Sequence, residues 1–168
     1  MIVERLAARC SCGAVEIEAV GKPIVSVVCY CDDCQAAARN IETMPNAASF
    51  RLNDGGTPLI VYRKDRVRCV RGEAKLTKLK LRDGSATNRR LATCCNSVMV
   101  LDFDDAKHWV DIYGFRVEKD APKPEMLTCT KFAAGELANP DKLPAYSGYP
   151  PKLVFKLLAA RVAMLFSR

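Results

Sequence analysis

The cysteines are the residues whose type and spacing offer the clearest chemistry in this sequence. Five of the nine fall between residues 10 and 34, in two compact groups, Cys10-Ser11-Cys12-Gly13 and Cys29-Tyr30-Cys31-Asp32-Asp33-Cys34. Cys94 and Cys95 form a later pair, and Cys69 and Cys129 stand alone. Thiolates separated by one or two residues can converge on one ion through a tight turn, and zinc accepts such ligands tetrahedrally. The spacing therefore predicts metal binding.

The groups predict two kinds of site. Two ligands from a local turn need a second pair from elsewhere to complete a closed structural site, whereas three ligands from one segment leave a coordination position open for water or substrate. Cys10 and Cys12 therefore form half of a closed site, and Cys29, Cys31 and Cys34 form an open one. The alternative is that these cysteines are small buried hydrophobic residues. Random burial does not explain five thiols within 25 residues.

A helix is expected directly after the second group. Residues 32–39 begin with two acids, continue with good helix formers and end with Arg39, which is the charge order that a helix dipole favours. Cys34 would lie in the first turn, where the helix dipole makes a thiol easier to ionise. Asp33 is expected to cap the helix, with an acid–base role as the alternative.

Length and composition fit one soluble globular domain. The chain has 168 residues, of which 49% are hydrophobic and 27% charged, and this excludes wholesale disorder, collagen and coiled coils. No run approaches the roughly 20 apolar residues of a membrane-spanning helix, and the first residues do not predict a signal peptide. An odd number of cysteines cannot form a complete disulfide framework in one chain. We therefore expect a cytoplasmic protein whose thiols stay reduced or bind metal.

The hydrophobic pattern predicts a mainly β protein. Residues 1–120 are expected to form a zinc-binding β domain, and residues 121–168 a proline-rich wrapping tail and a C-terminal helix packed on the same domain. The helix is expected over Lys152–Phe166, after a proline that suits a first helical turn. Strands are expected at Val15–Ala19, Ile24–Cys29, Pro58–Tyr62, Arg66–Val70, Leu76–Arg82, Ser97–Phe103 and Trp109–Phe115.

Positive charge is concentrated in the middle of the chain. The net charge is +7, and residues 62–90 hold eleven Lys and Arg against three acids. In Lys75–Arg82 the charges alternate with apolar residues, which is typical of a strand with one solvated face. Nucleic-acid binding is less favoured because no aromatic residues interleave with the charges, so we expect no DNA partner.

Three further features suggest contacts or packing. The C-terminal helix has a wide apolar stripe, so we expect it to pack on the domain or on a second copy of the chain. A membrane-surface helix is the less favoured alternative. His108, the only histidine, is interpreted as a surface or packing residue. Cys69 is expected in the core, and Cys129 is expected to be structural unless the tail brings it to the site.

The cysteine pattern resembles that of the glutathione-dependent formaldehyde-activating enzymes, a family that includes the centromere protein V-like domain. Their pattern has C-x-C-G-x-V, then C-x-C-x-x-C, then C-x-x-C-G-[S/T]-x-[L/F]. Residues 10–15 match the first part, residues 29–34 the second, and residues 95–99 align with the end of the third. The resemblance covers roughly residues 8–103.

The resemblance implies a β-rich, tent-like fold of short antiparallel sheets with up to two zinc ions. Cys10, Cys12 and Cys95 would hold a structural zinc, and Cys29, Cys31 and Cys34 an active-site zinc that binds the thiol of glutathione. The third part departs from the pattern, since Ala92 occupies the place of a ligand. Cys94 or Cys69 can replace that ligand, or the site is incomplete; Cys94 is favoured.

Two single-residue departures also matter. Asn96 stands where glycine is usual, and asparagine is the next most tolerant residue for positive φ, so the turn is expected to survive the substitution. Tyr30 replaces a histidine that often lies between the first two thiols of the triplet, which would alter the pocket's polarity.

The implied reaction is the addition of a glutathione-type thiol to formaldehyde or a similar small carbonyl, a carbon–sulfur lyase activity. A bound metal lowers the pKa of the thiol, and a nearby donor protonates the oxygen. A basic rim of Arg63, Arg66, Arg68 and Arg71 is expected to attract the anionic thiol. The alternatives are a zinc-stabilised binding module, a glutathione carrier without catalysis, and a metal-poor relative with redox-active thiols.

Overall fold

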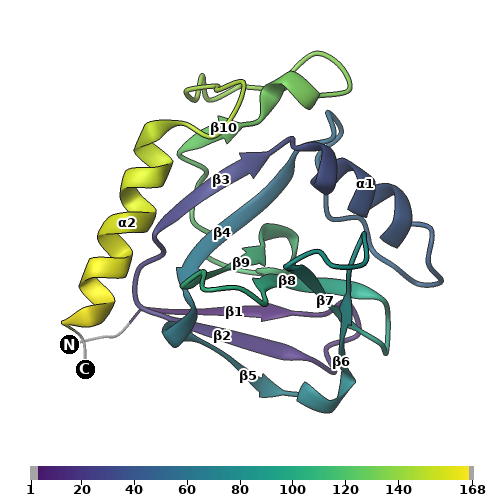
Figure 1. The fold of residues 1–168 in the computed structure, drawn as a ribbon. Coiled ribbons are helices and arrows are strands. Elements are labelled where there is room, and N and C mark those ends of the chain that lie inside the picture. The colour runs from purple at the N-terminus through teal and green to yellow at the C-terminus, as the bar shows by residue number, and fades with distance from the viewer. Residues whose placement is uncertain (1–3, 167–168) are drawn as a thin grey trace.

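Residues 4–166 are described by the computed structural model, in which two β-sheets and two α-helices make up the fold (Figure 1). The smaller sheet has the order β1-β2-β5, with β1 at Arg5–Arg9, β2 at Glu16–Val20 and β5 at Val67–Arg71. The larger has the order β10-β3-β4-β9-β8-β7-β6. Its strands are β3 (Val25–Cys29), β4 (Thr57–Arg63), β6 (Leu76–Leu79), β7 (Thr87–Ala92), β8 (Ser97–Phe103), β9 (Trp109–Tyr113) and β10 (Met126–Thr128).

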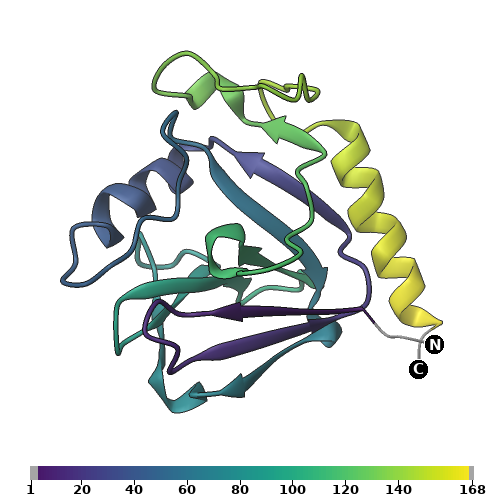
Figure 2. The ribbon, with the colours of Figure 1, turned by 180° about the vertical axis from the view of Figure 1, so that it is seen from behind.

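The helices are those that the sequence predicts. Helix α1 spans Asp32–Ile41 and contains Cys34, the last thiol of the second group, and α2 spans Pro151–Leu165. Figures 1 and 2 both place them on opposite sides of the molecule. The mainly β fold is confirmed, and its sheets are antiparallel with one exception, because β10 pairs with β3 in parallel. The proline-rich tail therefore contributes an edge strand to the larger sheet.

The larger sheet has a hydrophobic core on each face, and β4 shows why. Its side chains alternate between the faces, so Leu59 and Val61 pack in the core that contains α1, while Ile60 and Tyr62 pack in the core shared with β1 and β2. A strand that is buried on both faces has an almost continuous apolar sequence. This sheet is thus the central layer of the molecule, between the smaller sheet and the helices.

Cross-strand register aligns four residues on the helix-bearing face. Val61 on β4 pairs with Asp111 on β9, Asp111 pairs with Leu101 on β8, and Leu101 pairs with Arg89 on β7. Directly paired residues on one face lie side by side. The register therefore places one acid and one base in an otherwise apolar row.

Three strands were not expected from the sequence, namely β1, β7 and β10. The inward positions of β1 are Leu6 and Ala8, and alanine gives little apolar contrast to reveal the alternation. Strand β7 carries Asn88 and Arg89 at buried positions, and β10 has only three residues. Such segments have weak intrinsic β propensity, and they form strands because they pair with neighbouring strands in the folded protein.

The basic residues of the middle segment pair with acids from other elements. Arg68 and Arg71 on β5 pair with Glu18 and Glu16 on β2, at 2.8 Å and 3.0 Å. Further pairs join Lys78 to Asp104, Arg90 to Asp102 and Arg82 to Asp33. The interpretation as a solvated strand face agrees with these pairs.

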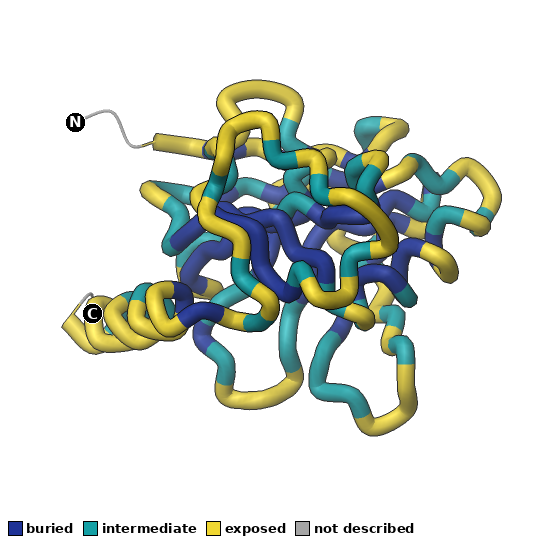
Figure 3. Tube along the Cα trace, turned by 90° about the horizontal axis from the view of Figure 1, so that it is seen from above, coloured by how far each residue is buried: buried dark blue, intermediate teal, exposed yellow. Residues whose placement is uncertain are grey.

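Helix α2 is apolar on two faces. Leu153 and Leu157 face the domain, and the Nε2 of His108 lies 2.7 Å from the carbonyl oxygen of Leu157, so His108 is a packing residue. The outward face exposes apolar side chains, including Phe155 (72%) and Leu158 (60%), and Figure 3 shows α2 extending along the edge of the molecule with most of its tube exposed. That α2 joins two copies of the chain stays a prediction. No helix within residues 4–166 has the length and apolar content needed to cross a membrane.

One glycine is required by close packing. A Cβ on Gly56 would lie 2.5 Å from the Cγ1 of Val28 and 2.7 Å from the ring of Tyr30, both buried. We expect Gly56→Ala to destabilise the protein by about 1–3 kcal/mol, the range for overpacking a core. Urea unfolding followed by circular dichroism measures the change. Gly135→Ala is the matched control, because nothing lies within 4 Å of its Cβ; equal losses in the two variants would contradict the packing argument.

Candidate metal centres

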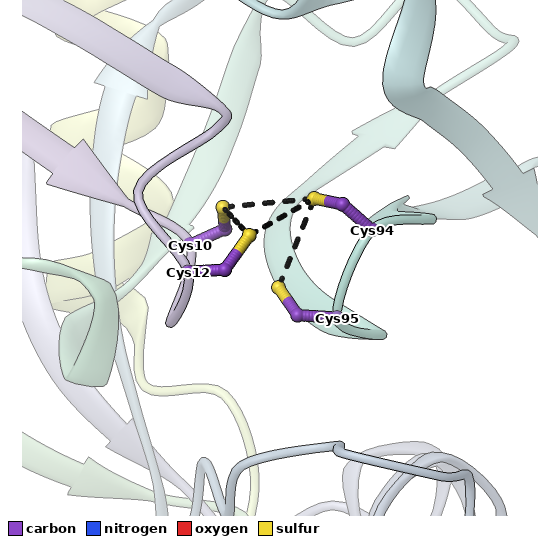
Figure 4. Close-up of side chains that lie close together, drawn as sticks. All are labelled: Cys10, Cys12, Cys94 and Cys95. Carbon is purple, nitrogen blue, oxygen red and sulfur yellow. Dashed lines mark hydrogen bonds between the residues drawn. The ribbon is translucent and has the colours of Figure 1, made fainter.

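Four thiols from two distant turns converge in one group. Cys10 and Cys12 follow β1, while Cys94 and Cys95 lie in the turn between β7 and β8. Their Sγ atoms all lie within 4.8 Å of one another. Cys94 is central, with its sulfur 3.3 Å from that of Cys12 and 3.9 Å from those of Cys10 and Cys95 (Figure 4). Sulfurs at the corners of a tetrahedron with metal–sulfur bonds of about 2.3 Å lie about 3.8 Å apart, so the spacing suits one zinc ion.

Two positive-φ residues hold these turns. Gly13 has φ of 75°, and the turn around it returns the chain so that the amide of Val15 donates to the Sγ of Cys10 at 3.2 Å. Asn96 has φ of 50°, so asparagine takes the left-handed conformation in the place where the family pattern has glycine. The expectation that this turn survives the substitution is confirmed.

The surroundings of Cys95 in the four-thiol group stabilise negative charge. Burial would raise the pKa of Cys95, but hydrogen bonds from Ser11 and Ser97 and from nearby backbone amides outweigh it and lower that pKa to about 5. Arg116 is buried (5% exposed), and its guanidinium donates to the Oγ of Ser97 at 3.3 Å. A buried cation next to the group offsets part of the charge that several thiolates would carry.

Three further thiols form a second group where β3 meets α1. The Sγ atoms of Cys29, Cys31 and Cys34 lie within 4.8 Å of one another, and Cys29 and Cys34 are buried. Cys31 is the N-cap of α1, and its Sγ accepts a hydrogen bond from the amide of Cys34 at 3.4 Å. Because Cys31 caps the helix and Cys34 lies in its first turn, this contact holds the two residues close together. The N-cap is therefore Cys31 and not Asp33, whose carboxylate pairs with Arg82.

The thiol that is easiest to ionise is not the one expected. Hydrogen bonds from Cys29 and Cys34 lower the pKa of Cys31 well below its usual range. For Cys34, a hydrogen bond with Cys29 lowers the pKa, but a hydrogen bond to Cys31, burial and the charge at Cys31 outweigh it, so the pKa is raised. The prediction for Cys34 is wrong because the capping thiol holds the charge.

A cavity of about 420 Å³ opens next to this second group, and Cys29, Cys31 and Cys34 line it. Its floor includes the cross-strand row that contains Asp111 and Arg89. Burial raises the pKa of Asp111 to about 7, helped by negative charge at Cys31. The Oδ1 of Asp111 is buried and has no hydrogen-bond partner among residues 4–166. A carboxyl oxygen without a partner, on a residue that lines a cavity, is suited to contact a bound molecule.

The tail of the chain also contributes to the lining of the cavity. Leu153 and Leu157 of α2 line it together with Tyr149. The hydroxyl of Tyr149 interacts with Cys31 and Cys129, and Cys129 also hydrogen bonds with Cys29. Cys129 thus adjoins the three-thiol group, as one of the two sequence interpretations allowed.

All seven predicted ligands fall into these two groups, and Cys94, not Cys69, joins the first. The thiol of Cys69 lies on β5 and donates to the carbonyl oxygen of Arg71 at 3.1 Å. Tyr30 is buried and donates to Asp54 at 2.7 Å, and it is not among the cavity-lining residues, so it leaves the polarity of the cavity unchanged.

The predicted basic rim is wrong. Arg63, Arg66, Arg68 and Arg71 do not line the cavity. Arg68 and Arg71 belong to the smaller sheet, where they pair with Glu18 and Glu16. Charge density along the sequence does not reveal which sheet a strand joins, and this is the reason for the error.

Sequence reasoning also missed residues that line the cavity. Asp111 and Arg89 were not singled out, although each is a charged residue within an otherwise apolar or buried strand. An acid between Val110 and Ile112 in an expected strand was the available signal. Tyr149 gave no comparable signal, because only the path of the tail brings it near the thiols.

Comparison with known proteins agrees with this geometry. The family model described as glutathione-dependent formaldehyde-activating enzyme matches residues 5–131. The chain belongs to this family. The match extends past Phe115 and includes Cys129, so it covers more of the chain than the cysteine pattern alone indicated. Helix α2 lies outside it.

A crystal structure of a Rhodobacter sphaeroides protein shares the fold of this family member. The two are 16% identical, the alignment covers 84% of this chain and 99% of the other, and the TM-score is 0.50. No curated protein matches the chain.

Both thiol groups of this formaldehyde-activating family member suit zinc. The first offers four sulfurs at tetrahedral spacing, and the second offers three sulfurs next to a cavity. That zinc occupies them stays a prediction.

We expect two zinc ions per chain in the purified protein. Cys31→Ser should remove one of them and Cys94→Ser the other, because each variant takes a ligand from only one group. Cys94→Ser should also lower stability by several kcal/mol, since a closed structural site contributes directly to folding. Elemental analysis together with urea unfolding measures both effects.

The control for these variants is Cys69→Ser, which changes a thiol outside both groups and should keep both ions. Full metal content in Cys94→Ser would show that Cys94 is not a ligand.

Proposed function

We propose that this protein adds a glutathione-type thiol to formaldehyde or a similarly small carbonyl compound, a carbon–sulfur lyase activity. The observation that carries the proposal is the three-thiol group at the wall of a cavity that Asp111 also lines, with its Oδ1 unpartnered among the described residues. Three protein ligands leave a coordination position for a substrate, in contrast to the four-thiol group. The family name supports a thiol substrate.

The reaction forms one carbon–sulfur bond. The sulfur of the thiol attacks the carbonyl carbon, the π electrons of the C=O bond move to the oxygen, and the oxygen gains a proton while the thiol loses one. The product is a hydroxymethyl thioether or its homologue, and no oxidant or reductant is required.

The protein contributes ligands, orientation and a proton. Cys29, Cys31 and Cys34 would hold zinc, which when bound lowers the pKa of a substrate thiol so that it is ionised at neutral pH. Asp111 is suited to donate a proton to the carbonyl oxygen, because its Oδ1 has no partner among the described residues. Arg89 also lines the cavity, and its Nη2 donates to the carbonyl oxygen of Asp33 at 3.1 Å. Its positive charge would stabilise the negative charge that develops on the carbonyl oxygen of the substrate.

The proposed acid can be tested separately from thiol binding. In zinc-loaded protein, Asp111→Asn should lower the rate of S-hydroxymethylglutathione formation by about 100-fold, the lower end of the usual contribution of a general acid. Affinity for the thiol should change little, because the ligands are unchanged. NMR exchange spectroscopy with glutathione and formaldehyde measures the rate above the uncatalysed background.

Cys31→Ser should abolish both rate and thiol binding, and Cys69→Ser should keep both. If the wild type binds the thiol without raising the rate above background, the protein is a carrier and the catalytic proposal fails.

A further inference from the structure

The cavity beside Cys29, Cys31 and Cys34 is walled mainly by hydrocarbon. Its apolar lining comes from β3, β4, β8 and α2 and includes Val27, Leu59, Val61, Leu101, Leu153 and Leu157. A volume of about 420 Å³ lies within the range of sites for ligands of drug size. Formaldehyde has two heavy atoms and would fill only a small part of it.

Several of the polar groups at the cavity are already paired, although the Nε of Arg89 and the Oδ1 of Asp111 have no hydrogen-bond partner among the described residues. Lys107 pairs with Asp105 and lies over the ring of Phe103, and Asp33 pairs with Arg82 at 2.7 Å. Among the described residues, Lys107 and Arg89 are the only basic residues in the lining. Glutathione carries two carboxylates and an ammonium group, and burying such charges without partners is costly. The wall therefore suits only the reacting end of a polar thiol.

We infer that the cavity binds a substrate whose reacting group carries a hydrocarbon chain, with the chain lying between the larger sheet and α2. The inference deepens the proposed function by naming the class of substrate, and it rests on that function only for the identity of the reacting group. The hydrocarbon can belong to a thiol or to an aldehyde, because both present the same chain to the same wall.

The preference for a hydrocarbon chain depends on helix α2, which is not part of the region that matches the family model. The helix supplies Leu153 and Leu157 to the cavity. The helix is held in place by two contacts. His108, directly before β9, contacts the carbonyl oxygen of Leu157 through its Nε2, and Lys156 pairs with Glu125 at 2.6 Å. The apolar wall is thus attached to the catalytic domain at defined points.

The chain contains its own probe for such a ligand. Trp109, the only tryptophan, lines the cavity, so its fluorescence reports occupancy without any need for turnover. Zinc-loaded protein is titrated with aldehydes and with thiols of four, six and eight carbons, and with glutathione. Burying one methylene supplies a factor of about three to four in affinity, so dissociation constants should fall by about that factor per carbon in at least one series.

Adjacent leucines on α2 provide a matched pair of variants. Leu157 lines the cavity, whereas Leu158 lies on the outward face and is 60% exposed. Leu157→Asn should weaken binding of the eight-carbon ligand at least tenfold, and Leu158→Asn should change it less than twofold. Leu157→Met keeps an apolar wall and should retain binding, which separates loss of the wall from loss of the fold.

Comparison of the aldehyde series with the thiol series shows whether the hydrocarbon belongs to the aldehyde or to the thiol. In cobalt-substituted protein, a thiol that joins the metal changes the visible charge-transfer spectrum, and an aldehyde alone does not.

Affinities that do not depend on chain length, or tighter binding of glutathione than of every alkyl ligand, would overturn the inference. The proposed function would survive that result if glutathione and formaldehyde still react. Conversely, a chain-length dependence without any turnover would support the apolar site and sink the catalytic proposal.

Discussion

Mutual repulsion between ionised thiols is the constraint that the rest of the structure must satisfy. Two unit charges about 4 Å apart repel by about 4 kcal/mol at an effective dielectric constant of about 20. The chain nevertheless places four sulfurs within 4.8 Å of one another, and three more within the same limit elsewhere. Such proximity is favourable when the thiols stay protonated or when a divalent cation lies among them. The hydrogen bonds to Cys95 favour its thiolate, and the buried guanidinium of Arg116 lies beside the same group; both features suit the second case.

The two thiol groups have different surroundings. The four-thiol group suits a structural role, and the three-thiol group suits a role in chemistry. The four-thiol group joins the turn after β1 to the turn between β7 and β8, so it connects the two sheets. The three-thiol group lies where β3 passes into α1, with Cys31 capping the helix. Because β3 is buried and paired on both sides, with β10 and β4, that group has a rigid support. The cavity lies beside this group, and the tail adds Tyr149 and Cys129 next to it but no second pair of thiols.

The sequence predicts what depends on local spacing. Neighbours along the chain are enough to predict the three-thiol group, the Cys10–Cys12 pair, the helix that contains Cys34 and the C-terminal helix. Features that depend on register do not follow in the same way. Asp111 becomes part of the site because it pairs with Val61 and Leu101, and Arg71 leaves it because β5 pairs with β2. Cys94 illustrates the boundary, since spacing left it among alternatives and only the packed turns bring it to Cys12 at 3.3 Å.

If the proposed function holds, helix α2 separates substrate choice from metal chemistry. The residues that would hold metal, and Asp111, lie within residues 5–131, which match the family model, whereas Leu153 and Leu157 lie outside them. A change in the helix can therefore reshape the cavity without altering a ligand or the proposed acid. The docking of α2 through a backbone carbonyl favours such changes, because His108 contacts Leu157 at an atom that every residue type provides. On this argument, differences in substrate among proteins with the same thiol groups should arise in the segment that covers the cavity, while the sheet beneath it is retained.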